Sequence, residues 1–169
     1  MMSEVLKIDD IDRQIIHLIQ EHPNLTHTQI SKHVNRSQPT VGMRIRKLEE
    51  IGVLQFQAGI NIKYADMSFA RVEIQARSPE EIYKIVQKCP FMLNCFRISG
   101  DYNISILITS FSLDEVEKIV NFHFRNNPFV NKVIIEIITD VMMDFVIPFD
   151  FSLKECICKL ADNCWTSKE

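Results

Sequence analysis

The sequence has no apolar segment long enough to cross a membrane. Its longest apolar runs, "VIIEII" and "ISILI", have the length of strands, far below the roughly 20 residues that a membrane helix needs. The N-terminal stretch "MMSEVLKIDDIDRQ" also lacks the basic region and following apolar run with which a secretory signal begins. These absences predict a soluble, cytoplasmic protein with no membrane partner.

Motifs for catalysis are absent as well. The sequence contains no glycine-rich phosphate-binding loop and no arrangement that pairs a nucleophile with a base. Its histidines show no metal-binding spacing, so we expect no metal and no cofactor. Nothing in the residue pattern by itself indicates an enzyme.

The five cysteines form no complete set of disulfide partners or metal ligands. Their number is odd, in a chain long enough to bury a core, which argues against an obligatory disulfide framework. The cluster of Cys156, Cys158 and Cys164 supplies fewer thiols than the full tetrahedral set of a structural zinc site. We expect small buried thiols, including Cys89 and Cys95, with a redox-sensing thiol or an inter-subunit disulfide as the alternative for the cluster.

Positive charge, by contrast, is concentrated in one short stretch. The whole chain has a net charge of −3, yet residues 32–48 contain no acid. Five cations lie in this stretch: Lys32, Arg36, Arg44, Arg46 and Lys47. Helix faces that are merely solvated usually mix both signs of charge, so the segment favours a surface for an anionic partner over a solvated face.

The residues up to position 54 predict three short helices joined by tight turns. Apolar residues recur at helical spacing after Asp9 or Asp10, either of which can cap the first helix. Thr26 and Gln29 form a capping box for the second helix, and Ser37 is placed to cap the third. Such short helices must pack together, and the second and third have the dimensions of a helix-turn-helix.

The third helix is expected to turn cations outward. Its inner stripe is Val41, Ile45 and Leu48, and a rotation of about 100° per residue places other side chains near the opposite side. Polar and cationic side chains there suit the major groove of DNA, where they reach base edges and phosphates. The predicted DNA-contacting residues are Lys32, Arg36, Ser37, Gln38, Thr40, Met43, Arg44, Arg46 and Lys47.

The second part of the chain alternates strands and helices. Residues 68–76 alternate apolar and polar side chains, as a half-buried strand does. Helices are expected after Ser78, with Glu81 closing a capping box, and after Ser112. Further strands are expected near residues 93–99 and 104–110 and along 131–145. The order β-α-β-β-α-β is typical of an α+β, ferredoxin-like domain whose antiparallel sheet carries both helices on one face.

The predicted domain boundaries come from these elements. The segment from residue 53 to 64 is interpreted as two short strands about an Ala58–Gly59 turn, which form a wing, or as the linker to the second domain. The predicted domains are a helix-turn-helix at 1–54, a wing or linker at 55–67, a ferredoxin-like domain at 68–148 and a cysteine-containing tail helix at 149–169.

Three stretches of the sequence match a known family pattern. They are "IDDIDRQIIHLIQEHPNLTHTQISKHVNRSQPTVGMRIRKLEEIGVL", "FRISGDYNISILI" and "NPFVNKVIIEIIT". On these residues the chain resembles the Lrp/AsnC (feast/famine) family of transcription regulators, over roughly residues 8 to 146. The pattern is met at Asp9, Asp12, Ile15, Ser37, Arg44, Arg46, Leu48, Glu49, Gly52, Val53 and Leu54.

This resemblance implies a sequence-specific regulator of double-stranded DNA that is not an enzyme. Its fold would be a winged helix-turn-helix followed by a ferredoxin-like (RAM/AsnC-type) domain. The resemblance also implies homodimers that pair through the sheets of the second domain, often assembled into tetramers or octamers.

The resemblance further implies a small effector, commonly an amino acid, near one turn of the second domain. The matching residues are Gly100, Asp101, Tyr102 and Asn103, with Thr139 on the last strand as a further candidate. The family often has an aspartate where this chain has Asn103. The same stretch, "SGDYN", also fits a plain hairpin turn whose tyrosine packs at an interface.

Two other functions fit the same layout. Sirohaem decarboxylases share the two-part architecture, but they need cationic or histidine side chains around a porphyrin-sized pocket. In the second domain only Arg97 and His123 could supply these. The other alternative is an effector-sensing assembly protein whose DNA contacts have lapsed, against which the Ser37 cap and the basic helix argue.

Overall fold

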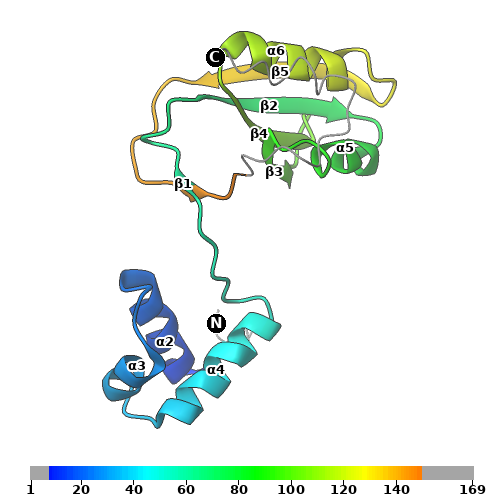
Figure 1. Cartoon of the computed structure of the whole chain (residues 1–169). Helices are drawn as coiled ribbons and strands as arrows, with labels where there is room; N and C mark the ends of the chain where they lie inside the picture. The colour runs from blue at the N-terminus through cyan, green and yellow to red at the C-terminus, as the bar shows by residue number, and fades with distance from the viewer. Residues whose placement is uncertain (1–7, 150–169) are drawn as a thin grey trace. The chain divides into compact units, whose positions relative to one another are not determined.

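The computed structural model describes residues 8–149, which divide between two compact units, 8–57 and 58–149 (Figure 1). Each unit has its own hydrophobic core. The tail helix expected over residues 149–169 lies, apart from its first residue, outside the described residues. Within the described range, each helix is too short or too polar to span a membrane.

The first unit contains three short helices: α2 (Asp10–Glu21), α3 (His27–His33) and α4 (Gln38–Glu50). The residue before each helix, Asp9, Thr26 or Ser37, accepts a hydrogen bond from a backbone N–H of the first turn. These bonds satisfy donors that the start of a helix leaves unpaired. The expected caps of α3 and α4 are confirmed, and Asp9 rather than Asp10 caps α2.

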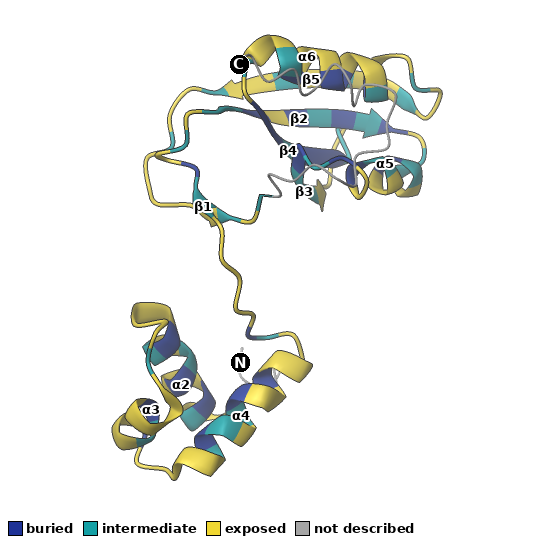
Figure 2. Ribbon diagram, in the orientation of Figure 1, coloured by how far each residue is buried: buried dark blue, intermediate teal, exposed yellow. Residues whose placement is uncertain are grey.

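Apolar residues of all three helices meet in one core (Figure 2). This core consists of Ile15, Ile19, Ile30, Val34, Val41, Ile45, Leu48 and Leu54. A seven-residue helix such as α3 is not stable alone, so burial against its neighbours holds it. Gly52, with a φ of +72°, follows α4 and allows the chain to leave the helix in a left-handed conformation.

The second unit is built on a four-stranded antiparallel sheet with the order β3-β4-β2-β5. The strands are β2 (Ser68–Ala76), β3 (Met92–Arg97), β4 (Ile104–Ser110) and β5 (Val130–Ile138). Helix α5 (Pro79–Val86) follows β2, and α6 (Leu113–Val120) continues through a π-helical turn, η1 (Asn121–Arg125), before β5. The predicted α+β fold class and element order are confirmed.

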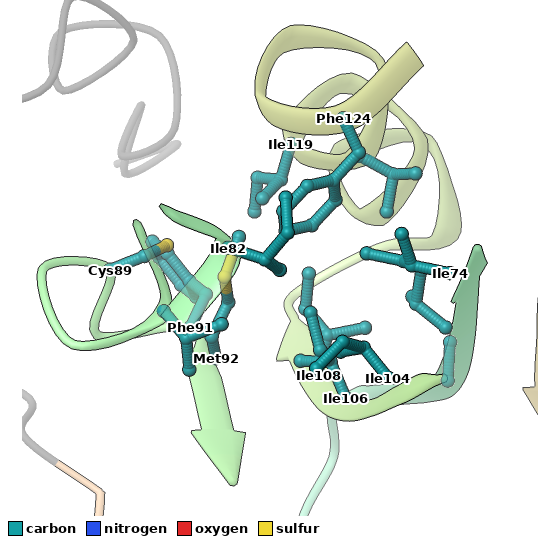
Figure 3. Close-up of a cluster of buried hydrophobic side chains, with 14 of the residues drawn as sticks. Ile74, Ile82, Cys89, Phe91, Met92, Ile104, Ile106, Ile108, Ile119 and Phe124 are labelled. Atoms are coloured by element: carbon teal, nitrogen blue, oxygen red, sulfur yellow. The ribbon is translucent and has the colours of Figure 1, made fainter. Parts of the chain in front are cut away.

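The core of this unit lies between the sheet and its two helices (Figure 3). Strand β2 contributes Val72 and Ile74, α5 contributes Ile82, and α6 with η1 contributes Ile119 and Phe124, all of them buried. Because both helices share one cluster with the sheet, they cover the same face. The alternation predicted for β2 therefore selects which face is covered.

The opposite face of the sheet carries a row of side chains from all four strands. The strand register places Phe96, Ser105, Glu73 and Ile134 side by side. Phe96 and Ile134, at the two edges, are 52% and 43% exposed. Between them the Ser105 hydroxyl donates to the Glu73 carboxylate at 2.7 Å. This row is thus apolar at its two ends and polar in the middle.

The two strands expected about the Ala58–Gly59 turn are not formed as a hairpin. The single short strand there, β1 (Ile60–Asn61), pairs instead with β6 (Val146–Ile147) from the far end of the described chain. A Cβ on Gly59 would lie 2.3 Å from the Ile147 carbonyl oxygen, so this close pairing requires glycine. The expected hairpin is therefore wrong, and residues 60–61 instead form part of the second unit.

Smaller expectations about the second domain were wrong. Ser78 precedes α5 but makes no side-chain cap bond. The Glu81 side chain forms an ion pair with Lys84 at 2.7 Å instead of closing a capping box. The final strand is shorter than the expected 131–145, since β5 ends at Ile138 and the chain then turns back toward β1.

Candidate nucleic-acid interface

The turn between α3 and α4 brings the two helices together as a compact pair. Asn35 adopts a positive φ of 50°, a conformation that asparagine tolerates better than most residues. Ser37 then accepts from the Thr40 backbone N–H at 3.4 Å, and the Ser37 and Thr40 hydroxyls lie 2.8 Å apart. The hydroxyls expected at the start of α4 therefore lie together at its N-terminus.

The outward side of α4 is set by what it buries. Val41, Ile45 and Leu48 are buried as predicted, which leaves Met43 on the exposed side at 66% exposure. Arg46 and Lys47 are exposed with it, as are Gln38 and Pro39 in the first turn. A methionine beside two cations can offer an apolar contact to a thymine methyl group while its neighbours reach phosphates.

Lys32 and Arg36 extend this surface beyond α4. Lys32 is exposed in the last turn of α3, and Arg36 is exposed in the turn, where its Nη1 donates to the Asn35 carbonyl at 2.8 Å. Among the ion pairs described within residues 8–149, none involves Lys32, Arg36, Arg46 or Lys47. Their charges therefore meet no carboxylate within the described chain.

Arg44 is different from the other cations of this run. Its Nη1 donates to Asp9 Oδ2 and to Asp12 Oδ1, at 2.7 Å each, and its side chain is only 25% exposed. The Asp12 backbone N–H and then the Arg44 guanidinium lower the pKa of Asp9. The same two carboxylates, Asp12 first, raise the pKa of Arg44. No local pattern indicates that Arg44 is held by acids more than 30 residues earlier in the chain.

The predicted effector turn joins β3 to β4. Gly100 has a φ of +124°, which favours glycine, while Asp101 is exposed and Tyr102 is half-buried. Asn103 is committed to β2, because its Oδ1 accepts from the Ala76 N–H and its Nδ2 donates to the Ala76 carbonyl, both at 2.8 Å. An ionised aspartate at this position could only accept hydrogen bonds and could not donate to the Ala76 carbonyl. The pairing with Ala76 therefore explains structurally why asparagine suits this position.

Thr139 does not join this turn within one chain. It follows β5, which forms the edge of the sheet opposite β3. The register also pairs Ile138 with Phe69 at the start of β2, whereas Asn103 binds Ala76 at its end. Thr139 and the turn therefore lie at opposite ends and opposite edges of the sheet.

A groove of about 510 Å³ adjoins the predicted turn. It lies between α5 and β3, and its lining includes Arg97 and Ile104, the two residues that border the turn-containing loop. Lys84, Glu80 and Cys95 also line it. Arg97 Nη1 lies 3.4 Å from a Glu80 carboxylate oxygen, so the groove has groups of both signs.

The cysteines and the histidine of this domain have structural surroundings. Cys89 is buried, and Cys95 is half-buried with a thiol pKa raised by burial, as expected of small core thiols. His123 packs against Phe122 and its pKa is lowered by burial. It does not line the groove that contains Arg97. The cysteines of the tail lie outside the described residues, and residues 8–149 contain no cluster suited to a metal ion.

Comparisons with known proteins agree with this architecture. Residues 8–55 match the winged helix-turn-helix DNA-binding family. The chain is 28% identical to the HTH-type transcriptional regulator FL11 of Pyrococcus horikoshii over 118 residues, which cover 68% of this chain and 78% of that protein.

Solved structures share the fold of most of the chain. LrpC of B. subtilis superposes with a TM-score of 0.68 at 24% identity, covering 80% of this chain and 97% of LrpC. AsnC of E. coli also gives a TM-score of 0.68, at 16% identity, covering 83% of this chain and 97% of AsnC. The two-domain fold that the resemblance implied is thereby confirmed.

The hydrogen bonds of Asn103 predict that a negative charge at this position lowers the stability of the fold. In Asn103→Asp the carboxylate cannot donate to the Ala76 carbonyl and repels it, so we expect the free energy of unfolding to fall by about 1–3 kcal/mol. Urea denaturation at neutral pH measures this. Asp101→Asn, an amide–acid exchange at an exposed position of the same turn, is the control and should leave stability unchanged. Equal midpoints for the two variants would contradict the structural role of Asn103.

Proposed function

We propose that this chain, which has the winged helix-turn-helix domain and the two-domain fold of the Lrp/AsnC regulators, is a transcription regulator that binds specific sequences of double-stranded DNA. The observation that carries the proposal is the surface of α3 and α4, where four exposed cations and the exposed Met43 on the outward side of α4 lie within sixteen residues of the chain. Its matches to named regulators support the same function. A cytoplasmic location would follow from DNA as the partner.

The proposed contacts fall into two classes. Lys32, Arg36, Arg46 and Lys47 would neutralise phosphates, because their charges meet no carboxylate within residues 8–149. Ser37, Gln38, Thr40 and Met43, at the start and middle of α4, would reach base edges. Arg44, which the sequence pattern grouped with these residues, has its guanidinium occupied within the domain.

The phosphate contacts predict how binding depends on salt. Arg46→Ala/Lys47→Ala should weaken binding to all fragments and reduce the slope of log affinity against log salt by about 0.9 per lost phosphate contact. A pool of genomic duplexes, titrated at several salt concentrations, measures both quantities. Lys88→Ala/Lys118→Ala removes the same charge from the second domain and should leave the slope intact. If the two double variants bind alike, the basic surface of α4 is only solvated.

The second domain supports assembly into dimers through the helix-free face of its sheet. Two exposed apolar side chains, Phe96 and Ile134, flank the hydrogen-bonded Glu73 and Ser105 on this face. Alongside this row, Arg71 donates to Glu136 at 2.5–2.8 Å. A second copy related by a two-fold axis could cover the apolar edges and carry a second α4 to the other half of a DNA site. Tetramers or octamers would be assembled from such dimers.

Charge placed on this face should disrupt the dimer. Ile134→Arg puts a cation where the second sheet would pack, so we expect the molecular mass measured by light scattering to fall toward that of a monomer. Leu113→Arg changes an equally exposed apolar residue, at 47% exposure, on α6 and should keep the mass of the wild type. Equal masses for both variants would exclude this face as the interface.

We place the proposed effector at the turn of Gly100, Asp101, Tyr102 and Asn103 and in the groove beside it. The groove offers Arg97 and Lys84 for a carboxylate and Glu80 for an ammonium group, the two charges of an amino acid. Thr139 could take part only from another copy, because its own chain holds it at the opposite end of the sheet.

An effector of this kind should stabilise the folded protein. A ligand at one hundred times its dissociation constant adds about 2.7 kcal/mol, enough to raise the melting temperature measurably. Screening the common amino acids against the wild type should find such a rise, and Asp101→Ala and Arg97→Ala should reduce it. Lys63→Ala, which removes a cation that does not line the groove, is the control. A rise that survives both test variants would place the effector elsewhere.

A further inference from the structure

One cation of the basic run is bound by two carboxylates of a different helix. Arg44 Nη1 lies 2.7 Å from Asp9 and 2.7 Å from Asp12, which are 35 and 32 residues earlier in the chain. The two acids also bind each other's backbone, since Asp12 N donates to Asp9 Oδ1 at 2.9 Å and Asp9 N to Asp12 Oδ2 at 3.1 Å. The capping box of α2 and the middle of α4 therefore form one hydrogen-bonded network, the Asp9–Asp12–Arg44 latch.

Burial distinguishes this latch from a surface ion pair. The Asp12 side chain is 5% exposed and that of Arg44 is 25% exposed. A carboxylate held at that depth without a partner would be costly, so the arginine is required by its surroundings. The exposed pair between Arg13 and Asp10, on the same turn of α2, has side chains that are 50% and 79% exposed and carries no such requirement.

The position of Arg44 on α4 agrees with an internal role. At about 100° per residue, Arg44 lies roughly 70° from the centre of the buried stripe of Val41, Ile45 and Leu48. Met43, Arg46 and Lys47 lie within roughly 50° of the opposite direction by the same count. Two carboxylates already bind Arg44, and moving it to a phosphate would leave the buried Asp12 carboxylate without a cation. Arg44 therefore belongs to the inward half of the helix.

We propose that Arg44 is a positioning residue and not a DNA contact. Through Asp9 and Asp12 it fixes the rotation of α4 against α2, and so aims Met43, Arg46 and Lys47 at the DNA. Asp9 and Asp12, although negatively charged, therefore contribute to DNA binding by holding Arg44 and with it α4. This inference rests on the proposed function, since it assigns roles within the same DNA-binding surface.

The direction in which one substitution changes DNA affinity distinguishes a phosphate-contacting Arg44 from a positioning Arg44. If Arg44 were a phosphate contact, removing an acid that competes for it would strengthen DNA binding. If the latch aligns α4, Asp12→Asn should instead weaken binding, by roughly tenfold, the factor that about 1.4 kcal/mol produces. Asp10→Asn is the matched control, with the same change of charge on the same helix turn, and should not weaken binding. Affinity of the full chain for its selected duplex measures both.

The salt dependence provides a second, independent readout. Arg44→Ala should weaken binding while the slope of log affinity against log salt stays that of the wild type. Lys47→Ala should reduce that slope by about 0.9. Asp9→Asn is a milder test if Asp12→Asn fails to fold, because asparagine caps a helix as well as aspartate does and only the charge facing Arg44 is lost. It should weaken binding in the same direction and less.

Hydrogen exchange of the full-length protein tests the latch without DNA. The backbone amides of α4 should exchange faster in Asp12→Asn and Asp9→Asn than in Asp10→Asn or the wild type. If the wild type binds no duplex, the proposed function fails, and hydrogen exchange alone decides whether the latch holds α4. Equal exchange in all variants, stronger binding by Asp12→Asn, or a reduced salt slope in Arg44→Ala would each overturn the inference.

Discussion

The packing of α4 against α2 and α3 is the constraint on which the first unit depends. Helices of seven to thirteen residues are marginal in water, so each must bury its apolar stripe to persist. Because Val41, Ile45 and Leu48 are buried in the core of this unit, the side chains on the opposite side of α4 face outward. The same burial that stabilises the unit therefore creates the exposed surface of Met43, Arg46 and Lys47.

Burial alone leaves the rotation of a short helix loosely defined, because apolar contacts are non-directional. Hydrogen bonds between charged groups add the missing direction. In this chain they join Arg44 to the two acids that also cap the start of α2. One small network therefore caps a helix, binds a half-buried cation and connects α2 with α4. A basic surface on α4 is in this way supported by two acids at the start of α2.

In the second unit, hydrogen bonds outside the four-stranded sheet connect segments that the sheet itself does not pair. The side chain of Asn103 pairs with both backbone groups of Ala76, just where β2 shifts register and runs past the start of β4. The β1–β6 pair ties the segment after Gly59 to the chain beyond β5.

The alternation in residues 68–76 predicted the covered face of the sheet, and caps such as Thr26 and Ser37 predicted where helices begin. The β1–β6 pair could not be predicted, because two residues per strand carry no periodicity and their partners, Ile60 and Ile147, lie far apart in the chain.

The sequence by itself determined the order of the elements, the inner stripes of the helices and the acid-free basic run, because these depend on neighbours a few residues apart. Only the tertiary structure decided how the five cations of that run divide. Arg44 and Lys47 are alike as cations on one helix, yet one meets Asp9 and Asp12 and the other is exposed. The same holds for Thr139, whose distance from the turn at Asn103 follows from strand order. Charge and spacing in the sequence can suggest a role for a side chain. Whether the side chain is free for that role depends on partners from distant parts of the chain, and only folding brings these into contact.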